Sequence, residues 1–149
     1  MNRRRGIGRA GSRAQALVEF ALVAPLFFLL IFAVIDFGRY VYYVQILNNA
    51  AREGARYAIV HGSNSLNPTG PTSSDPSGNA VKSVVRSYAV GVIGDSTVLV
   101  VNPSWNPTSL NTRGTRVTVQ VTYPFHSVIP VVPLPPVTIN GESTLVINN

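Results

Sequence analysis

The chain has 149 residues, with 12 Lys plus Arg, 6 Asp plus Glu and no Cys, so it holds one modest domain with a net charge of +6 and no disulfide framework. The positive charge is concentrated near the N-terminus, where no acid accompanies Arg3, Arg4, Arg5, Arg9 and Arg13. The remaining 136 residues carry 7 basic and 6 acidic groups. Because a nucleic-acid binder distributes its basic groups over a folded face, this pattern argues against a nucleic-acid partner.

An apolar run follows the basic arm. Of the 22 residues from Ala14 to Ile35, 19 are hydrophobic, and only Gln15, Glu19 and Pro25 interrupt them. As a helix, Leu17 to Ile35 spans roughly 28 Å, close to the hydrocarbon thickness of a bilayer. A signal peptide is the competing interpretation, but its apolar region has only about 7 to 15 residues and ends at a small-x-small cleavage site. The length therefore favours a retained membrane anchor.

The distribution of charge around the span predicts its orientation. Five arginines precede the apolar run, whereas only Asp36 and Arg39 follow it closely. The positive-inside rule then places the N-terminus in the cytoplasm and the C-terminal 110 or so residues outside. We expect a single-pass protein of the cytoplasmic (inner) membrane, with membrane lipid as its first partner.

Two residues inside the span have alternative interpretations. Pro25 cannot donate to the carbonyl of Ala21 and is predicted to kink the helix, either without consequence or as a flexible turn used in assembly. Glu19 is a carboxylate in an apolar helix, which is costly unless it is paired or functional. It either reaches the head groups and Arg13 or meets the positive charge of a partner subunit.

Three blocks carry a resemblance to a known family. They are QALVEFALVAPL at residues 15–26, DFGR at 36–39 and NAAREGARYA at 49–58. Together they closely resemble the TadE-like family of pilin-related proteins from tight-adherence (Tad/Flp) pilus systems. The resemblance implies a bacterial or archaeal minor pilin or pseudopilin of a type IV-like filament. It also implies other pilin-like subunits, the pilus assembly platform and prepilin peptidase as partners.

The resemblance assigns roles to residues near the start of the span. Glu19 matches the glutamate that pilin-type subunits carry four residues after the first residue of the mature protein. Prepilin peptidase would then cut between Ala14 and Gln15, although the family usually has Gly before the cut and the nearest glycine here is Gly11. Removal of the leader creates an α-amine that can neutralise the buried carboxylate of an adjacent subunit.

The apolar pattern predicts that the helix continues beyond the span. One stripe of helical spacing contains Tyr40, Val44, Leu47, Ala51, Ala55 and Ala58. Residues 15–60 are therefore expected to form one rod of roughly 69 Å. Ala50, Gly54 and Ala58 form a small-residue seam for close packing, either on the sheet of the same subunit or on another subunit. A short ion-pair ladder of Arg52, Glu53 and Arg56 is expected on the solvated face.

The residues after the long helix predict a small α+β head. Residues 62–79 read as an exposed loop. Ala80 to Ile93 reads as a helix with Asn79 as its N-cap, Gly94 as its stop, and one face of Val81, Val84, Val85, Tyr88 and Val92. We expect strands over residues 97–101 and 115–123 and a last strand, or a bent pair around Asn140-Gly141, over 137–147. Loops are expected over residues 103–114, including Trp105, and over the proline-rich residues 125–136.

The resulting fold is α+β and pilin-like, with a long N-terminal helix, transmembrane and then amphipathic, packed on a small antiparallel sheet and one further helix. The expected organisation is a basic cytoplasmic leader (1–14), a transmembrane helix (15–37), its amphipathic continuation (38–61), an exposed loop (62–79) and an extracytoplasmic head (80–149).

Catalysis is not predicted. His61, His126 and six scattered acids make neither a metal cluster nor a triad, and no phosphate-binding glycine loop is present. We therefore expect no enzyme and no cofactor. The alternative to a pilus component is a permanently anchored extracytoplasmic binding module whose loops at 62–79 and 103–114 hold a ligand or partner.

Overall fold

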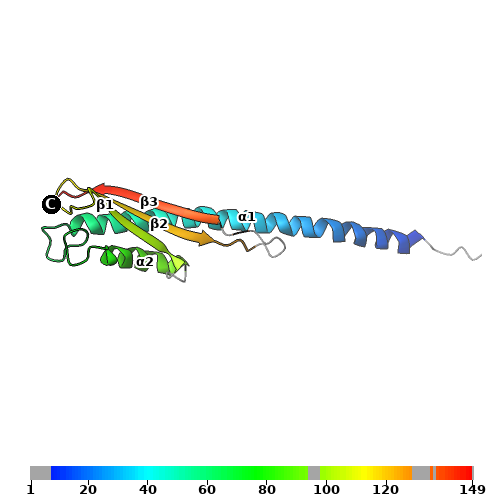
Figure 1. Cartoon of the computed structure of the whole chain (residues 1–149). Helices are drawn as coiled ribbons and strands as arrows, with labels where there is room; N and C mark the ends of the chain where they lie inside the picture. Colours follow the sequence, from blue (N-terminus) through cyan, green and yellow to red (C-terminus); the bar gives the residue numbers. More distant parts are fainter. Residues whose placement is uncertain (1–7, 94–97, 129–134, 136, 149) are drawn as a thin grey trace, which may run out of the picture. The chain divides into compact units, whose positions relative to one another are not determined.

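The computed structural model describes residues 8–93, 98–128, 135 and 137–148. The chain divides into two compact units, Met1–Gly38 with Val128–Pro133, and Arg39–Ser127 with Leu134–Asn149. The second unit is called the head below. Five elements are assigned (Figure 1): α1 (Gly8–Val60), α2 (Asn79–Ile93), β1 (Val100–Asn106), β2 (Arg116–Phe125) and β3 (Val137–Val146). The predicted α+β fold, with one long N-terminal helix that continues to residue 60, is confirmed.

The three strands form one antiparallel sheet in the order β1-β2-β3. The predicted strand over residues 115–123 is confirmed, and its alternation has the expected effect, because Val117, Val119 and Val121 are fully buried. The intervening side chains face away from the core. Antiparallel pairing with one covered face is the arrangement expected when a single helix packs on a small sheet.

The buried face of the sheet and the head part of α1 share one hydrophobic core. On α1 this core contains Leu47, Ala50, Ala51, Ala55 and Ala58. At Gly141 of β3 an added Cβ would lie 2.5 Å from the carbonyl carbon of Leu47, so the two backbones are in direct contact there. Glycine at position 141 therefore permits helix and strand to approach more closely than any side chain would allow.

The predictions for β1 and the loop after it are corrected. The strand was expected over residues 97–101, but it runs over Val100–Asn106, and residue 97 lies outside the described residues. Pro103 and Trp105, expected in a loop, pair with Val119 and Val117 of β2. Pro103 is tolerated because β1 is an edge strand, where a missing N–H donor need not disrupt the sheet.

The end of β2 also differs from expectation, whereas β3 is the single last strand that was one of the two alternatives over residues 137–147. β2 continues through Pro124 to Phe125, which is buried, although residue 125 was assigned to a loop. The bent pair around Asn140-Gly141 is wrong, because β3 is a single strand in which Gly141 pairs with Val121. The Asn-Gly signal reflects the close approach to α1 and not a turn. Residues 129–134 and 136 of the predicted proline-rich loop lie outside the described residues.

The helix α2 is confirmed, but its buried face is corrected. Its fully buried side chains are Val81, Val85 and Ala89, at a spacing of four. Tyr88, expected on that face, is 51% exposed. Side chains four residues apart lie on one face of a helix. Ala89 is on the face of Val81 and Val85, whereas Tyr88 is not. The predicted stop at Gly94 and the side chain of Val92 lie outside the described residues.

The segment over residues 62–78 has neither helix nor strand, as predicted, but it is only partly exposed, and Asn79 of the predicted loop is the first residue of α2. Leu66 is 100% exposed, whereas Thr69 is buried at 1%. Gly70 and Gly78 both have positive φ and lie against the ring of Trp105, so close that an added Cβ would overlap it. The loop therefore covers the indole, which explains why the tryptophan is buried on an edge strand.

Asp75 caps the N-terminus of α2, a role that we expected of Asn79. Its carboxylate accepts hydrogen bonds from the backbone N–H groups of Asn79 and Ala80, both at 2.8 Å, and from the hydroxyl of Thr69 at 3.0 Å. Burial raises the pKa of Asp75, but these hydrogen bonds and the charge of Lys82 outweigh it, so the pKa lies below the usual aspartate value. The cap thus joins the loop to α2.

Replacing Asp75 by Ala is expected to lower the free energy of unfolding by about 1 to 2 kcal/mol, because it leaves the first amides of α2 without their acceptor. Since the pKa of Asp75 is lowered by folding, its contribution is present above the ordinary aspartate pKa of about 3.9 and is lost as the pH falls below it. Thermal denaturation followed by circular dichroism at pH 7 and pH 3 measures both effects. Asn79→Ala is the matched control, and an equal or larger loss in that variant would contradict the assignment of the cap.

A fragment that begins at Arg39 is expected to fold cooperatively, whereas one that begins at Gly62 is expected to be poorly folded. The shorter fragment lacks the buried α1 residues and exposes the sheet face that they cover. Thermal unfolding of the two fragments tests this, and equal transitions would show that the head does not depend on α1.

Candidate functional site

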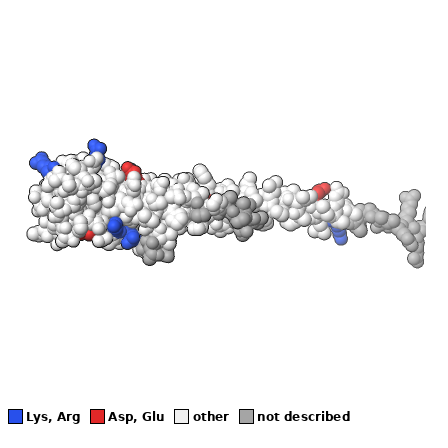
Figure 2. Space-filling view, viewed as in Figure 1, with Lys and Arg blue, Asp and Glu red and all other residues white. Residues whose placement is uncertain are grey.

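The first unit exposes an apolar helix. The most apolar 18-residue window of α1 has a mean hydropathy of 2.7 and none of its residues is buried, and by length and composition the helix could cross a membrane. In Figure 2 most of the visible face of this helix is free of charged side chains, apart from acidic and basic side chains near its N-terminal end. Leu22, Leu26 and Phe37 are each more than two-thirds exposed. A continuous apolar surface of this size requires lipid or another protein to cover it.

The residues of the predicted assembly site lie near the start of this helix. Glu19 is exposed, and one of its oxygens accepts a hydrogen bond of 3.0 Å from the side-chain amide of Gln15, one turn earlier. Gln15, the residue after the predicted cut, therefore shares one side of α1 with the carboxylate. Pro25 lies within α1, which is assigned as one helix on both sides of it.

The structure covers only part of the basic leader. Arg3, Arg4 and Arg5 lie outside the described residues. Arg9 lies in α1, although its side chain is not described, and Arg13 is exposed. Ala14, the residue before the predicted cut, is also exposed on the helix. The predicted roles of these residues in orientation and cleavage stay predictions.

Asp36, at the end of the apolar stretch, has a role that the sequence did not predict. It is only 8% exposed, and both carboxylate oxygens lie within hydrogen-bonding distance of the backbone N–H of Val128, at 2.9 and 3.1 Å. The contact joins α1 to a segment 92 residues later in the chain. The position of Asp36 directly after the apolar run could have indicated this contact, because a buried acid there is costly unless it has a hydrogen-bond partner.

The small-residue seam faces the interior of the head. Ala50 and Ala58 are fully buried, and Gly54 lies between α2 and β2. A Cβ at position 54 would overlap the side chain of Val85 and lie 3.4 Å from Val119. The seam is therefore covered by α2 and the sheet of the same chain. This agrees with packing within one subunit and not with packing on another subunit.

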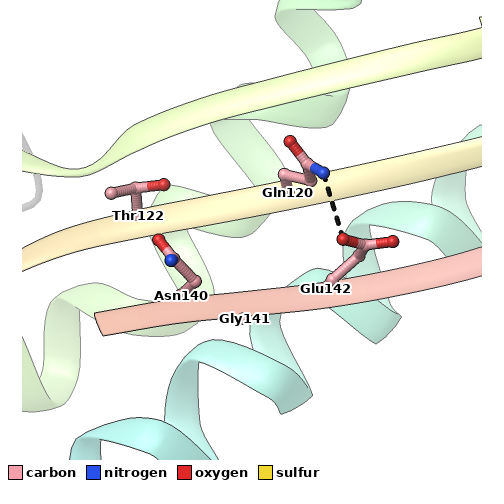
Figure 3. A pocket seen from close by; sticks show the side chains of 5 residues that line it. All are labelled: Gln120, Thr122, Asn140, Gly141 and Glu142. Carbon is pink, nitrogen blue, oxygen red and sulfur yellow. Dashed lines mark hydrogen bonds between the residues drawn. The ribbon is translucent and has the colours of Figure 1, made fainter. Parts of the chain in front are cut away.

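The outer face of the sheet carries a polar array that sequence patterning did not single out. Gln120 of β2 donates a hydrogen bond of 3.0 Å to Glu142 of β3, and Thr122 and Asn140 lie beside this pair (Figure 3). These residues and Gly141 line a cavity of about 190 Å³. The array follows from the strand register, in which Gln120 pairs with Glu142 and Thr122 with Asn140.

His61 directly follows the last residue of α1. His61 stacks on Tyr57 and its Nδ1 lies 2.9 Å from the carbonyl oxygen of that residue, as expected at the end of a helix. Within the part of the chain that the structure describes, no three His, Asp or Glu side chains are grouped as metal ligands.

Comparison with known proteins finds a family similarity in the N-terminal segment. The family model described as TadE-like protein matches residues 14–56, which confirms the predicted resemblance. No curated protein and no solved structure gives a significant match to the chain. The match covers 43 of the 149 residues, so the chain is similar to TadE-like proteins over this segment. The helix that contains the segment is long and apolar enough to cross a membrane.

Gly54→Ala tests the packing of the seam. The added methyl group gains up to about 1 kcal/mol of helix propensity, but it must displace the side chain of Val85, and overpacking of this kind costs about 1 to 3 kcal/mol. We therefore expect a net loss of stability in thermal denaturation. Gly91→Ala in α2 is the control, since a Cβ there meets nothing within 4 Å and is expected to stabilise the helix. A stabilised Gly54→Ala variant would contradict close packing at this position.

Proposed function

We propose that this protein is a minor pilin or pseudopilin-like component of a Tad-type, type IV-like pilus. In this proposal the apolar part of α1 anchors the chain in the cytoplasmic membrane. The basic leader stays in the cytoplasm and the head lies outside. The match to TadE-like proteins over residues 14–56 supports the pilus context, and the uncovered apolar helix supports the anchor.

The observation that carries the proposal is the placement of Glu19. Its carboxylate is exposed on a helix whose neighbouring side chains, Val18 and Phe20, are apolar and exposed. A lone carboxylate is costly in lipid, and a positive group on a neighbouring subunit removes that cost. The new α-amine of Gln15 in an adjacent subunit is such a group. A plain anchor has no need of a carboxylate at this position.

Contacts with other subunits would use the apolar side of the same helix. Leu26, Leu30, Val34 and Phe37 contribute to a groove of about 580 Å³ along α1. A groove of this composition accepts a second apolar helix in the membrane or in a filament. Lipid would fill it before assembly and another pilin-like subunit afterwards.

Cleavage by prepilin peptidase between Ala14 and Gln15 belongs to the same proposal. The cut would remove all five N-terminal arginines and lower the net charge from +6 to about +1. It would also create the amine that pairs with Glu19. Intact mass of the membrane-extracted protein tests this step, and a mature form that retains residues 3–13 would overturn it.

A second experiment distinguishes a filament component from a permanently anchored binding module. Glu19→Ala is expected to reduce co-purification of the chain with sheared pili by at least tenfold while its level in the membrane is unchanged. Glu53→Ala, at an acid in the head, is the matched control and is expected to behave as the wild type. Equal recovery of wild type and Glu19→Ala in the pilus fraction would contradict the role of Glu19. Absence of the wild-type chain from that fraction would favour an assembly factor or the anchored module.

A further inference from the structure

The head carries a polar groove on the side of α1 that the core does not use. It is called the arginine groove here, and it is lined by side chains of α1, by Tyr88 of α2 and by residues 143–145 of β3. Its volume is about 600 Å³ and it is open to solvent. Three elements that are separate in the sequence thus contribute to one surface.

Two guanidinium groups supply the charge of the groove. Arg52 and Arg56 are four residues apart on α1, so their side chains lie on the same helical face, and both are exposed. Glu53 also lines the groove, which leaves a net charge of +1. The predicted ion-pair ladder of Arg52, Glu53 and Arg56 is not formed, because neither arginine has a hydrogen bond or ion pair within the described part of the chain. Each guanidinium keeps a planar set of donors that fits a carboxylate in a bidentate manner.

Tyr88 adds an aromatic wall. The buried face of α2 consists of Val81, Val85 and Ala89, so the ring of Tyr88 has no place in the core and stays 51% exposed beside the arginines. Tyrosine presents an apolar ring face together with a hydroxyl group, which suits a ligand that has both C–H surface and polar groups.

Neutral polar groups complete the lining. Asn49 of α1 contributes an amide, with both donors and an acceptor, and Ser143 of β3 contributes a hydroxyl. Amide and hydroxyl groups match the hydroxyls of a sugar, a tyrosine ring matches the C–H face of a pyranose, and paired arginines match a carboxylate. An acidic peptide would also use the arginines, but it lacks the vicinal hydroxyls and the flat C–H face of a sugar ring that the neutral groups and Tyr88 suit.

We propose that the arginine groove binds an acidic polysaccharide of the uronic acid type. This inference concerns the head alone and does not depend on filament assembly or on cleavage of the leader. The carboxylate of one sugar would lie between Arg52 and Arg56, and its ring would lie on Tyr88. Asn49 and Ser143 would then bind its hydroxyls.

The test uses the full chain in a non-ionic detergent with oligogalacturonate as the probe, measured by titration calorimetry. Maltohexaose is the neutral control and poly-glutamate is the charge control. Arg52→Gln and Arg56→Gln are each expected to weaken oligogalacturonate binding about tenfold, because each removes charge-assisted hydrogen bonds. Tyr88→Ala is expected to weaken it, whereas Tyr88→Phe retains the ring and is expected to bind nearly as well as the wild type.

Arg86→Gln is the matched control, since Arg86 is an exposed arginine of α2 that does not line the groove. All substituted side chains are exposed, so the thermal transitions of the variants are expected to match that of the wild type. No binding of oligogalacturonate, equally tight binding of poly-glutamate, or an equal loss in Arg86→Gln would each overturn the proposal. In the last two cases, general charge attraction would account for the binding.

Discussion

Close contact of the α1 backbone with its neighbours at two glycines determines the structure of the head. At Gly54 the helix lies against Val85 and Val119, and at Gly141 the strand β3 lies against the backbone of Leu47. Protein interiors are packed so densely that one added methyl group must displace its neighbours. The buried alanines of α1 extend the same surface. The head therefore has its core only while α1 lies in this position, and no disulfide substitutes for that contact.

The sequence predicted the features that depend on composition and periodicity. The apolar run identified the exposed part of α1, and the alternation of Val117, Val119 and Val121 identified the central strand. Both signals are local, since each arises from the composition or alternation of residues within one element. The family resemblance over residues 14–56 was equally visible, because its motifs lie close together in the sequence.

The features that the sequence did not predict depend on contacts between distant residues. Asn140-Gly141 has the composition of a turn, and only the nearby helix shows that its glycine serves a close approach. Asp75 caps α2 although it lies four residues before the first residue of the helix. Capping rules consider only the residue next to the helix, so they predicted Asn79. Asp36 meets a backbone amide 92 residues away. In each case the partner is set by the tertiary fold and not by spacing.

Trp105 gives the head an intrinsic optical reporter. It is the only tryptophan in the chain, and Gly70 and Gly78 bring the loop directly over its ring. A ring in this position is shielded from solvent only while the loop is seated on β1. The fluorescence of the whole chain, and its quenching by small solutes, thus report the seating of a single loop without any added label.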